Sequence, residues 1–342
     1  MSKPRILMVA TGGTIASAEE GQGLAPSLTG EQLAGYVPQA ADLADIDIVQ
    51  PMNIDSTNMR PADWLRIADA VTSRYDGYDG FVVLHGTDTM AYTAAALSYL
   101  VQASPKPIVL TGSQQPMASP FTDARLNLYQ SVLYACDPDS HDVSVVFGGK
   151  VIAGTRARKQ RTMSFNAFSS VNYPELALIR NDRIIRTAPA ATSGGEPRRC
   201  GRRDSGAPTT YGLLDERVIV LKLTPDVNPS VFSLLERDYD AIILETFGIG
   251  GIPDTLHDAI FAWVGSGRTL VVTTQVPEEG LDLGVYEVGR PYAEHPGILK
   301  GADMTCEALV AKTMWALSQS RDAATLRDLF YSPVNCDRLP ER

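Results

Sequence analysis

The chain has 342 residues, of which 44% are hydrophobic and 20% charged, and its mean hydropathy is −0.06. This composition is typical of a soluble globular protein with about two domains, and it excludes fibrous and disordered classes. The net charge of −10 argues against a nucleic-acid partner, and no apolar run of about 18 residues predicts a membrane span.

Strand and helix patterns alternate through the first half of the chain, which is typical of a mostly parallel sheet flanked by helices. The predicted strands are residues 5–10, 47–52, 80–85, 108–111 and 143–147. The predicted helices are residues 61–75, 89–102 and 121–135. We expect these elements to form a larger N-terminal α/β domain over residues 1–187.

A change in composition separates this domain from the rest of the chain. Residues 188–212 are rich in Ala, Pro, Gly, Ser and Thr and lack apolar periodicity, which predicts a linker. Beyond it, the predicted strands are residues 217–223, 241–245 and 269–274, and the predicted helices are residues 253–264, 302–318 and 323–330. Residues 213–342 are therefore predicted to form a smaller C-terminal α/β domain.

Cysteine and histidine residues are scattered, and none stands at the spacing of metal ligands. These residues are Cys136, Cys200, Cys306, Cys336, His85, His141, His257 and His295. We therefore expect a reducing compartment, no metal and no other cofactor. The apolar run 6–10 is short and is followed by a Gly-rich turn, which predicts a buried strand rather than a secretory signal and hence a cytoplasmic protein.

Four predicted strand ends are rich in hydroxyl and carboxylate side chains. They are residues 11–14 (TGGT), 55–57 (DST), 85–89 (HGTDT) and 111–114 (TGSQ). Because ligands bind beyond the carboxyl ends of parallel strands, these clusters converge on one crevice if the strands are neighbours. Each cluster also has a purely structural explanation, as a tight turn, an Asx turn or a helix N-cap. Their recurrence at one edge favours a binding site.

The residue types in this crevice favour acyl transfer. A threonine hydroxyl is a nucleophile when a base takes its proton, and backbone N–H groups beside glycines can bind the oxyanion. A dinucleotide or P-loop site is not indicated, because neither G-x-G-x-x-G nor G-K-S/T follows Gly12. Of two basic runs, residues 198–203 fit a solvated surface. In residues 156–161 a lysine can help deprotonate a hydroxyl, although composition alone does not select Lys159.

Several segments resemble those of the bacterial-type L-asparaginases. The signatures are residues 11–17 (TGGTIAS) and 85–91 (HGTDTMA), and residues 245–253 (ETFGIGGIP) and 301–307 (GADMTCE) are further similar segments. The last segment is more similar to the cytoplasmic type. The resemblance implies hydrolysis of L-asparagine, with L-glutamine as an alternative substrate, to the acid and ammonia through a covalent acyl-enzyme. It also implies a homodimer or homotetramer.

The resemblance assigns roles by motif. Thr14 is the expected nucleophile, and Thr87, Asp88 and Lys159 form a second catalytic set in which Lys159 assists Thr87 in activating water. The expected substrate-binding residues are Gly13, Asp55, Ser56, Thr57, Gly86 and Ser113. Ser56 is expected at the α-carboxylate and Asp88 at the α-ammonium group, with Ser113 near the leaving amide.

One departure from the family pattern leaves alternatives open. Many members carry a tyrosine on the mobile loop after the first motif, whereas residues 23–26 here read GLAP, with Leu24. Another residue or a neighbouring subunit is then expected to complete the site, and residues 18–30 are the candidate lid. An amino-acid sensor is one alternative reading. Another is the asparaginase-like subunit of an archaeal amidotransferase, whose added N-terminal domain has no room before Thr11.

Overall fold

The computed structural model describes residues 3–13, 15, 17–20, 23–26, 35, 37–187, 206–285 and 289–339. The chain divides into an N-terminal unit, residues 1–212 with Val334–Cys336, and a C-terminal unit, residues 213–333 and 337–342. Val334–Cys336 therefore join the first unit although they lie inside the predicted C-terminal domain. Most of the predicted linker, residues 188–205, lies outside the described residues.

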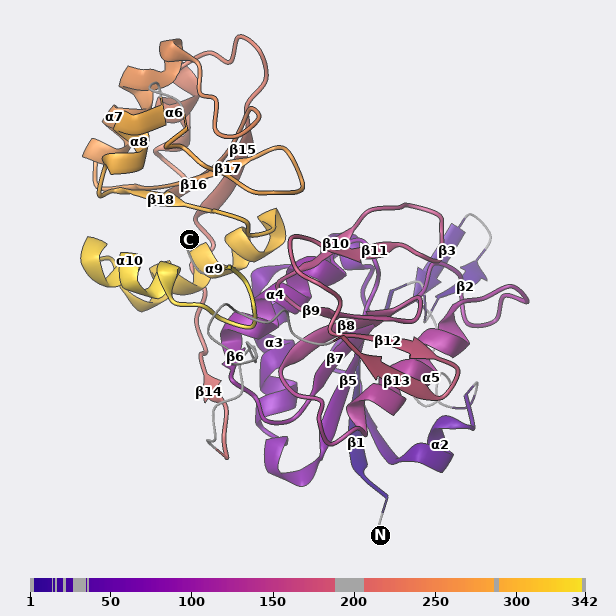
Figure 1. Cartoon of the computed structure of the whole chain (residues 1–342). Coiled ribbons are helices and arrows are strands. Elements are labelled where there is room, and N and C mark those ends of the chain that lie inside the picture. The colour runs from indigo at the N-terminus through magenta and orange to yellow at the C-terminus, as the bar shows by residue number, and fades with distance from the viewer. Residues whose placement is uncertain are drawn as a thin grey trace. The chain divides into compact units, whose positions relative to one another are not determined.

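The N-terminal unit is built on an eight-stranded sheet with the order β13-β12-β9-β8-β7-β5-β1-β4 (Figure 1). The strands are β1 Arg5–Ala10, β4 Asp45–Val49, β5 Gly80–Leu84, β7 Ile108–Thr111, β8 Val143–Phe147, β9 Lys150–Ala153, β12 Ala177–Arg180 and β13 Arg183–Arg186. From β4 to β8 the neighbours run parallel, and the three pairs from β8 to β13 are antiparallel. The predicted mostly parallel sheet and its five strands are confirmed, and the antiparallel edge was not predicted.

Helices pack on the two faces of this sheet. The predicted helices are α3 Pro61–Thr72, α4 Met90–Leu100 and α5 Ala124–Ala135, each shorter than expected, and a further helix is α2 Ala40–Leu43. Helices α3 and α4 pack against each other, and α2 packs against α5 (Figure 1). The inner strands are buried on both faces, which explains why β5 reads as an unbroken apolar run.

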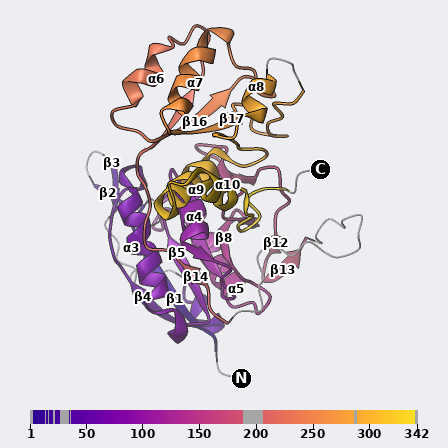
Figure 2. The same cartoon turned by 90° about the vertical axis from the view of Figure 1, so that its left-hand side faces the viewer.

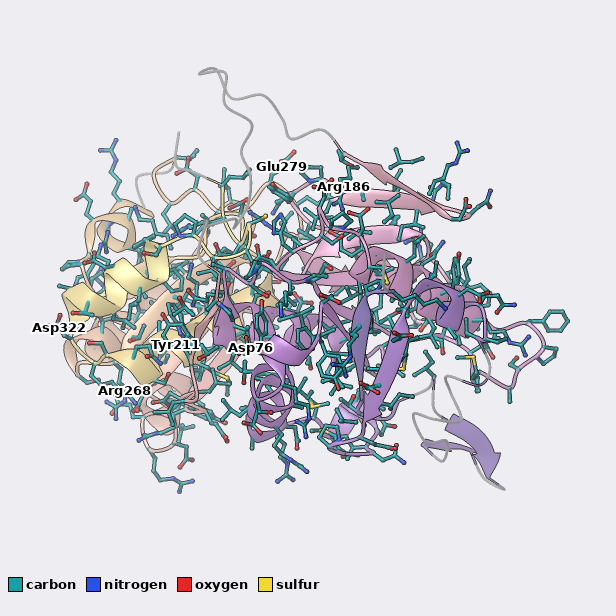
Figure 3. All side chains as sticks on the ribbon, turned by 90° about the horizontal axis from the view of Figure 1, so that it is seen from below. Asp76, Arg186, Tyr211, Arg268, Glu279 and Asp322 are labelled. Atoms are coloured by element: carbon teal, nitrogen blue, oxygen red, sulfur yellow. The ribbon has the colours of Figure 1, made fainter. Side chains whose placement is uncertain are left out.

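The antiparallel edge is tied back to α5. Arg186, labelled in Figure 3, donates through Nη2 to Asp137 Oδ1 at 2.5 Å and to Ser140 Oγ at 3.1 Å. Its guanidinium also lies 5.5 Å from the ring centroid of Tyr134. Strand β13 has an exposed, charged pattern that carries no clear strand signal, and these side-chain contacts hold it at the edge.

The C-terminal unit is a four-stranded parallel sheet in the order β15-β16-β17-β18. Its elements are β15 Val218–Lys222, α6 Ser230–Leu235, β16 Ala241–Thr246, α7 His257–Gly265, β17 Thr269–Thr274, α8 Arg290–Glu294, β18 Ile298–Lys300, α9 Cys306–Gln319 and α10 Ala323–Tyr331. Helix α9 packs on β15 and β16, and α10 packs on α9 (Figure 2). The predicted strands and helices are confirmed, whereas α6, α8 and β18 were not predicted.

Short pairings complete the N-terminal unit. Strand β10, Ala157–Lys159, pairs with β11, Phe168–Ser170, and β6, Val101–Gln102, pairs with β14, Thr209–Thr210. The segment predicted as a lid loop contains a hairpin of β2, Ser17–Glu20, and β3, Gly23–Pro26.

Two sequence-based expectations concern the surroundings of the protein. Within the described parts of the chain, no helix combines the length and apolar character that crossing a membrane requires. Cys136 and Cys306 are free thiols, whereas Cys336 is disulfide-bonded. The inference of a reducing compartment from cysteine spacing is therefore wrong as an argument, because separation along the chain does not exclude pairing in space.

Candidate active site

Four neighbouring parallel strands bring the four polar clusters to one edge of the sheet. Strands β7, β5, β1 and β4 are adjacent in this order, and each cluster follows the carboxyl end of one of them (Figure 1). The neighbour relation on which the predicted crevice depended is therefore confirmed. An isolated parallel bridge between Gly12 and Ile54 continues the pairing beyond β1 and β4.

The glycines of this edge lie backbone to backbone. Gly13 has φ +83°, and a Cβ built on it would lie 2.3 Å from Gly86 Cα. A Cβ on Gly86 would lie 2.5 Å from Ser56 Oγ, and Ser56 is only 3% exposed. Only glycine permits both approaches. Gly13, Ser56 and Gly86 therefore meet at one point, whereas Thr14, the expected nucleophile, lies outside the described residues.

Lys159 joins the third strand end from a different part of the chain. From the end of β10, its Nζ donates to Thr87 Oγ1 at 2.8 Å and to Asp88 Oδ1 at 2.5 Å. Thr87 is buried, the Lys159 side chain is 18% exposed, and the Asp88 side chain is 56% exposed. An exposed carboxylate thus pairs with a largely buried ammonium group beside a buried hydroxyl. The N-cap of α4 is Thr89, so Asp88 does not serve as the cap that sequence reasoning left open.

Two residues that sequence reasoning missed support this cluster. Thr87 Oγ1 donates to Gln114 Oε1 at 3.3 Å, and Gln114 Nε2 donates to the Ser164 carbonyl oxygen at 3.2 Å. The backbone N–H of Gln114 donates to both carboxylate oxygens of Asp123, at 3.0 and 3.1 Å. Gln114 belongs to the TGSQ cluster, which was its only sequence signal, and Asp123 had none.

The remaining predicted binding residues make local contacts. Asp55 Oδ1 accepts from Thr57 N at 2.9 Å and from Thr57 Oγ1 at 3.0 Å, and it caps the short helix Ser56–Asn58. This is the Asx-type explanation that the sequence left open. Ser113 is fully buried, and its hydroxyl donates to the Gln115 carbonyl oxygen at 2.5 Å. These residues border the cluster without a direct bond to Lys159.

His85 holds the turn that presents Gly86 and Thr87. Its ring has no exposed surface, and burial lowers its pKa to about 4, although a hydrogen bond with Gly86 acts in the opposite direction. The ring is therefore neutral at pH 7. Nδ1 then donates to the Gly86 carbonyl oxygen at 2.7 Å, and Nε2 accepts from Thr93 Oγ1 at 2.8 Å. This pattern locks one tautomer and one orientation of the turn.

Comparison with known families covers nearly the whole chain. Residues 5–191 match the family model described as Asparaginase, N-terminal, and residues 217–330 match the Glutaminase/Asparaginase C-terminal domain. An L-asparaginase of Thermococcus kodakarensis is 38% identical, over 95% of this chain and 96% of its own. L-asparaginase 1 of Escherichia coli K12 is 34% identical over the full length of both chains.

Solved structures give the same picture. The thermostable L-asparaginase of T. kodakarensis superposes with a TM-score of 0.88, covering 98% of this chain and 100% of that one at 35% identity. A probable cytoplasmic L-asparaginase of Campylobacter jejuni gives a TM-score of 0.81 at 27% identity, covering 96% and 99%. A glutamyl-tRNA(Gln) amidotransferase component of Metallosphaera sedula is 32% identical, over 93% of this chain but 73% of its own.

Proposed function

The chain belongs to the asparaginase family over both of its domains, and we propose that it hydrolyses the side-chain amide of L-asparagine through a threonine ester, releasing L-aspartate and ammonia. The observation that carries this function is the similarity to L-asparaginases at 34% and 38% identity over nearly the full length. The position of Lys159 Nζ, 2.8 Å from Thr87 Oγ1, supports the assignment of the catalytic groups. The M. sedula amidotransferase component is less similar, at 32% identity, which favours the hydrolase over that reading.

Thr14 is the proposed nucleophile of the first step. Its Oγ1 attacks the amide carbon of asparagine, the hydroxyl proton passes to the amide nitrogen, and the C–N bond breaks to release ammonia. Backbone N–H groups beside Gly13 and Gly86, which lie side by side, are the proposed donors to the oxyanion. Leu24 stands where many members have tyrosine, so the proton acceptor is another residue or belongs to a neighbouring subunit.

Thr87, Asp88 and Lys159 are proposed to act in the second step, in which water cleaves the ester. Lys159 is paired with Asp88 across the site. When the α-ammonium group of the substrate also binds Asp88, a second cation shares that carboxylate, which favours loss of the Lys159 proton. The neutral amine can then take a proton through Thr87 from the attacking water. The water oxygen bonds to the acyl carbon, and Thr14 regains its proton.

Substrate recognition is proposed to use the polar edge described above. Ser56 lies against Gly86, where its hydroxyl can bind the α-carboxylate, and the turn of Asp55 and Thr57 holds Ser56 in place. Ser113 is assigned to the leaving amide, although its hydroxyl must first turn away from Gln115. Gly13 and Gly86 supply backbone contacts in the same region.

Ammonia release from purified protein tests this function, with L-asparagine, L-glutamine and D-asparagine as substrates. Thr14→Ala is expected to abolish release, and Thr87→Ala and Lys159→Met to lower kcat by at least 100-fold, because each removes a proposed proton-transfer group. Lys150→Met is the matched control, since Lys150 lies on β9 and pairs with Glu175 away from the cluster. Binding of asparagine without ammonia release by the wild type would instead support an amino-acid sensor.

Two finer properties complete the proposal. A cytoplasmic location is supported by the similarity to the C. jejuni protein, which is named as a probable cytoplasmic L-asparaginase. A homodimer or homotetramer is proposed from the family resemblance, and light scattering of the purified chain measures it. Sigmoidal dependence of the rate on asparagine concentration would add coupling between subunits.

A further inference from the structure

The C-terminal segment Val334–Cys336 joins the N-terminal unit, although the residues on either side of it belong to the C-terminal unit. Asn335 makes three hydrogen bonds there. Its Nδ2 donates to Ser98 Oγ at 2.9 Å and to the Val143 carbonyl oxygen at 2.8 Å, and its carbonyl oxygen accepts from Thr155 Oγ1 at 2.5 Å. We call Val334–Cys336 the tail clamp, because it fastens three parts of the unit that are far apart in sequence.

The next residue of the clamp supports a buried guanidinium group. Arg156 has no exposed surface, and its Nε donates to the Cys336 carbonyl oxygen at 2.5 Å. Its guanidinium also lies 5.5 Å from the ring centroid of Tyr173. Because a buried charge is costly unless it is hydrogen bonded, the Cys336 carbonyl contributes to holding Arg156 inside the unit.

The backbone of the clamp explains why asparagine suits this position. Asn335 has φ 43° and Cys336 has φ 63°, both in the left-handed region. Asparagine tolerates this region better than most residues other than glycine. The turn presents two successive carbonyl oxygens to the hydroxyl of Thr155 and the guanidinium of Arg156.

The fastened elements are those that carry the proposed catalytic set. Ser98 lies on α4, the helix that begins just after Thr87 and Asp88, whereas Arg156 directly precedes β10, which carries Lys159. A Cβ built on Gly154 would lie 2.7 Å from Ser98 Oγ, so the turn before β10 contacts α4 with no space for a side chain. The clamp therefore binds both sides of the gap that Lys159 spans to reach Thr87.

We infer that Asn335 is a positioning residue for the second half-reaction: the tail clamp holds β10 against α4 and thereby sets the distance from Lys159 Nζ to Thr87 Oγ1. This inference rests on the proposed role of that pair in activating water. Ser56, Gly13 and Gly86 make none of their described contacts with the clamp, so substrate binding and the first half-reaction do not depend on it. A loosened clamp should slow hydrolysis of the ester alone, since proton transfer is sensitive to distances of about 1 Å.

The variant Asn335→Gly tests the inference. Glycine keeps the left-handed backbone and the carbonyl acceptor but removes both amide hydrogen bonds. We expect kcat to fall about tenfold while kcat/KM stays within about twofold of the wild type, because kcat/KM reports only the steps up to ester formation. A burst of about one ammonia per chain should precede the slow steady state. All proteins are assayed with dithiothreitol, so that the Cys336 disulfide does not hold the clamp in place.

Two controls decide between this role and a merely structural one. Asn181→Gly makes the same substitution at another left-handed asparagine, with φ 55°, in the turn between β12 and β13, and it should leave kcat unchanged. Loss of folded enzyme would lower kcat and kcat/KM together, and that result overturns the inference, as does an unchanged kcat in Asn335→Gly. If Lys159→Met retains full turnover, the proposed catalytic assignment fails, whereas an inactive Lys159→Met with an unaffected Asn335→Gly refutes the clamp alone.

Discussion

Acidification should destabilise the N-terminal unit through one buried side chain, His85. Burial lowers the pKa of His85 from 6.5 to about 4 in the folded chain. Above pH 6.5 the ring is neutral in the folded and unfolded states, so its contribution to stability is fully present. Between pH 6.5 and about 4 the unfolded chain binds a proton that the folded chain does not, and stability is lost as the pH falls.

The size of this loss follows from the two pKa values. One pKa unit corresponds to about 1.4 kcal/mol, so the interval from 6.5 to about 4 gives a loss of about 3 kcal/mol in the free energy of unfolding. That is a large part of the stability of an ordinary domain. The effect is local, because the ring bonds to Gly86 and Thr93 beside the proposed site.

The assay compares the wild type with His85→Gln, which cannot titrate but can still accept from Thr93. Urea unfolding is followed between pH 7 and pH 4 by hydrogen exchange of β5 amides, which report on the N-terminal unit alone. The carboxylates titrate in both proteins and cancel in the difference. The wild type should lose about 3 kcal/mol more than the variant over this range. Equal pH dependence of the two proteins would refute the reasoning.

Three further perturbations have expected outcomes. Asp123→Ala should lower the free energy of unfolding by about 2 to 3 kcal/mol and reduce kcat, because its carboxylate accepts backbone N–H groups of the loop after β7; urea unfolding and ammonia release measure this, and unchanged values contradict it. Asp337→Ala should destabilise the C-terminal unit by about 3 to 5 kcal/mol, because Lys312 is fully buried beside it, whereas Lys312→Met with Asp337→Leu should restore most of the loss in thermal unfolding. Gly13→Ala should abolish turnover, since its Cβ would meet Gly86, and a wild-type kcat would disprove that close packing.

The central strands were predictable because burial on both faces writes itself into the sequence. Strands β1, β5 and β7 lie inside the sheet and read as short, nearly continuous apolar runs. The antiparallel edge was not predictable in the same way. Strands β12 and β13 have four residues each with exposed positions, and side-chain bonds from Arg186 hold the edge in place.

The polar edge of the site was predictable for a related reason. Once parallel strands were recognised, their carboxyl ends had to carry the ligand-binding residues, and the close approach of Gly13 and Gly86 agrees with that expectation. Gln114 and Asp123 escaped notice because their roles depend on bonds between separate loops. The position of Lys159 beside Thr87 also depends on a pairing, that of β10 with β11, which no local pattern announces.

The discontinuous N-terminal unit has a consequence for how the protein is made. Residues 334–336 complete that unit, yet a ribosome adds them only after the whole of residues 213–333. A nascent chain can therefore assemble most of the large sheet early, while Arg156 still lacks the carbonyl of Cys336. Full alignment of β10 with α4 is then deferred to the end of translation. Activity becomes a check on completed synthesis, since a polypeptide cut short before residue 334 would fold most of its catalytic unit without the last segment that secures it.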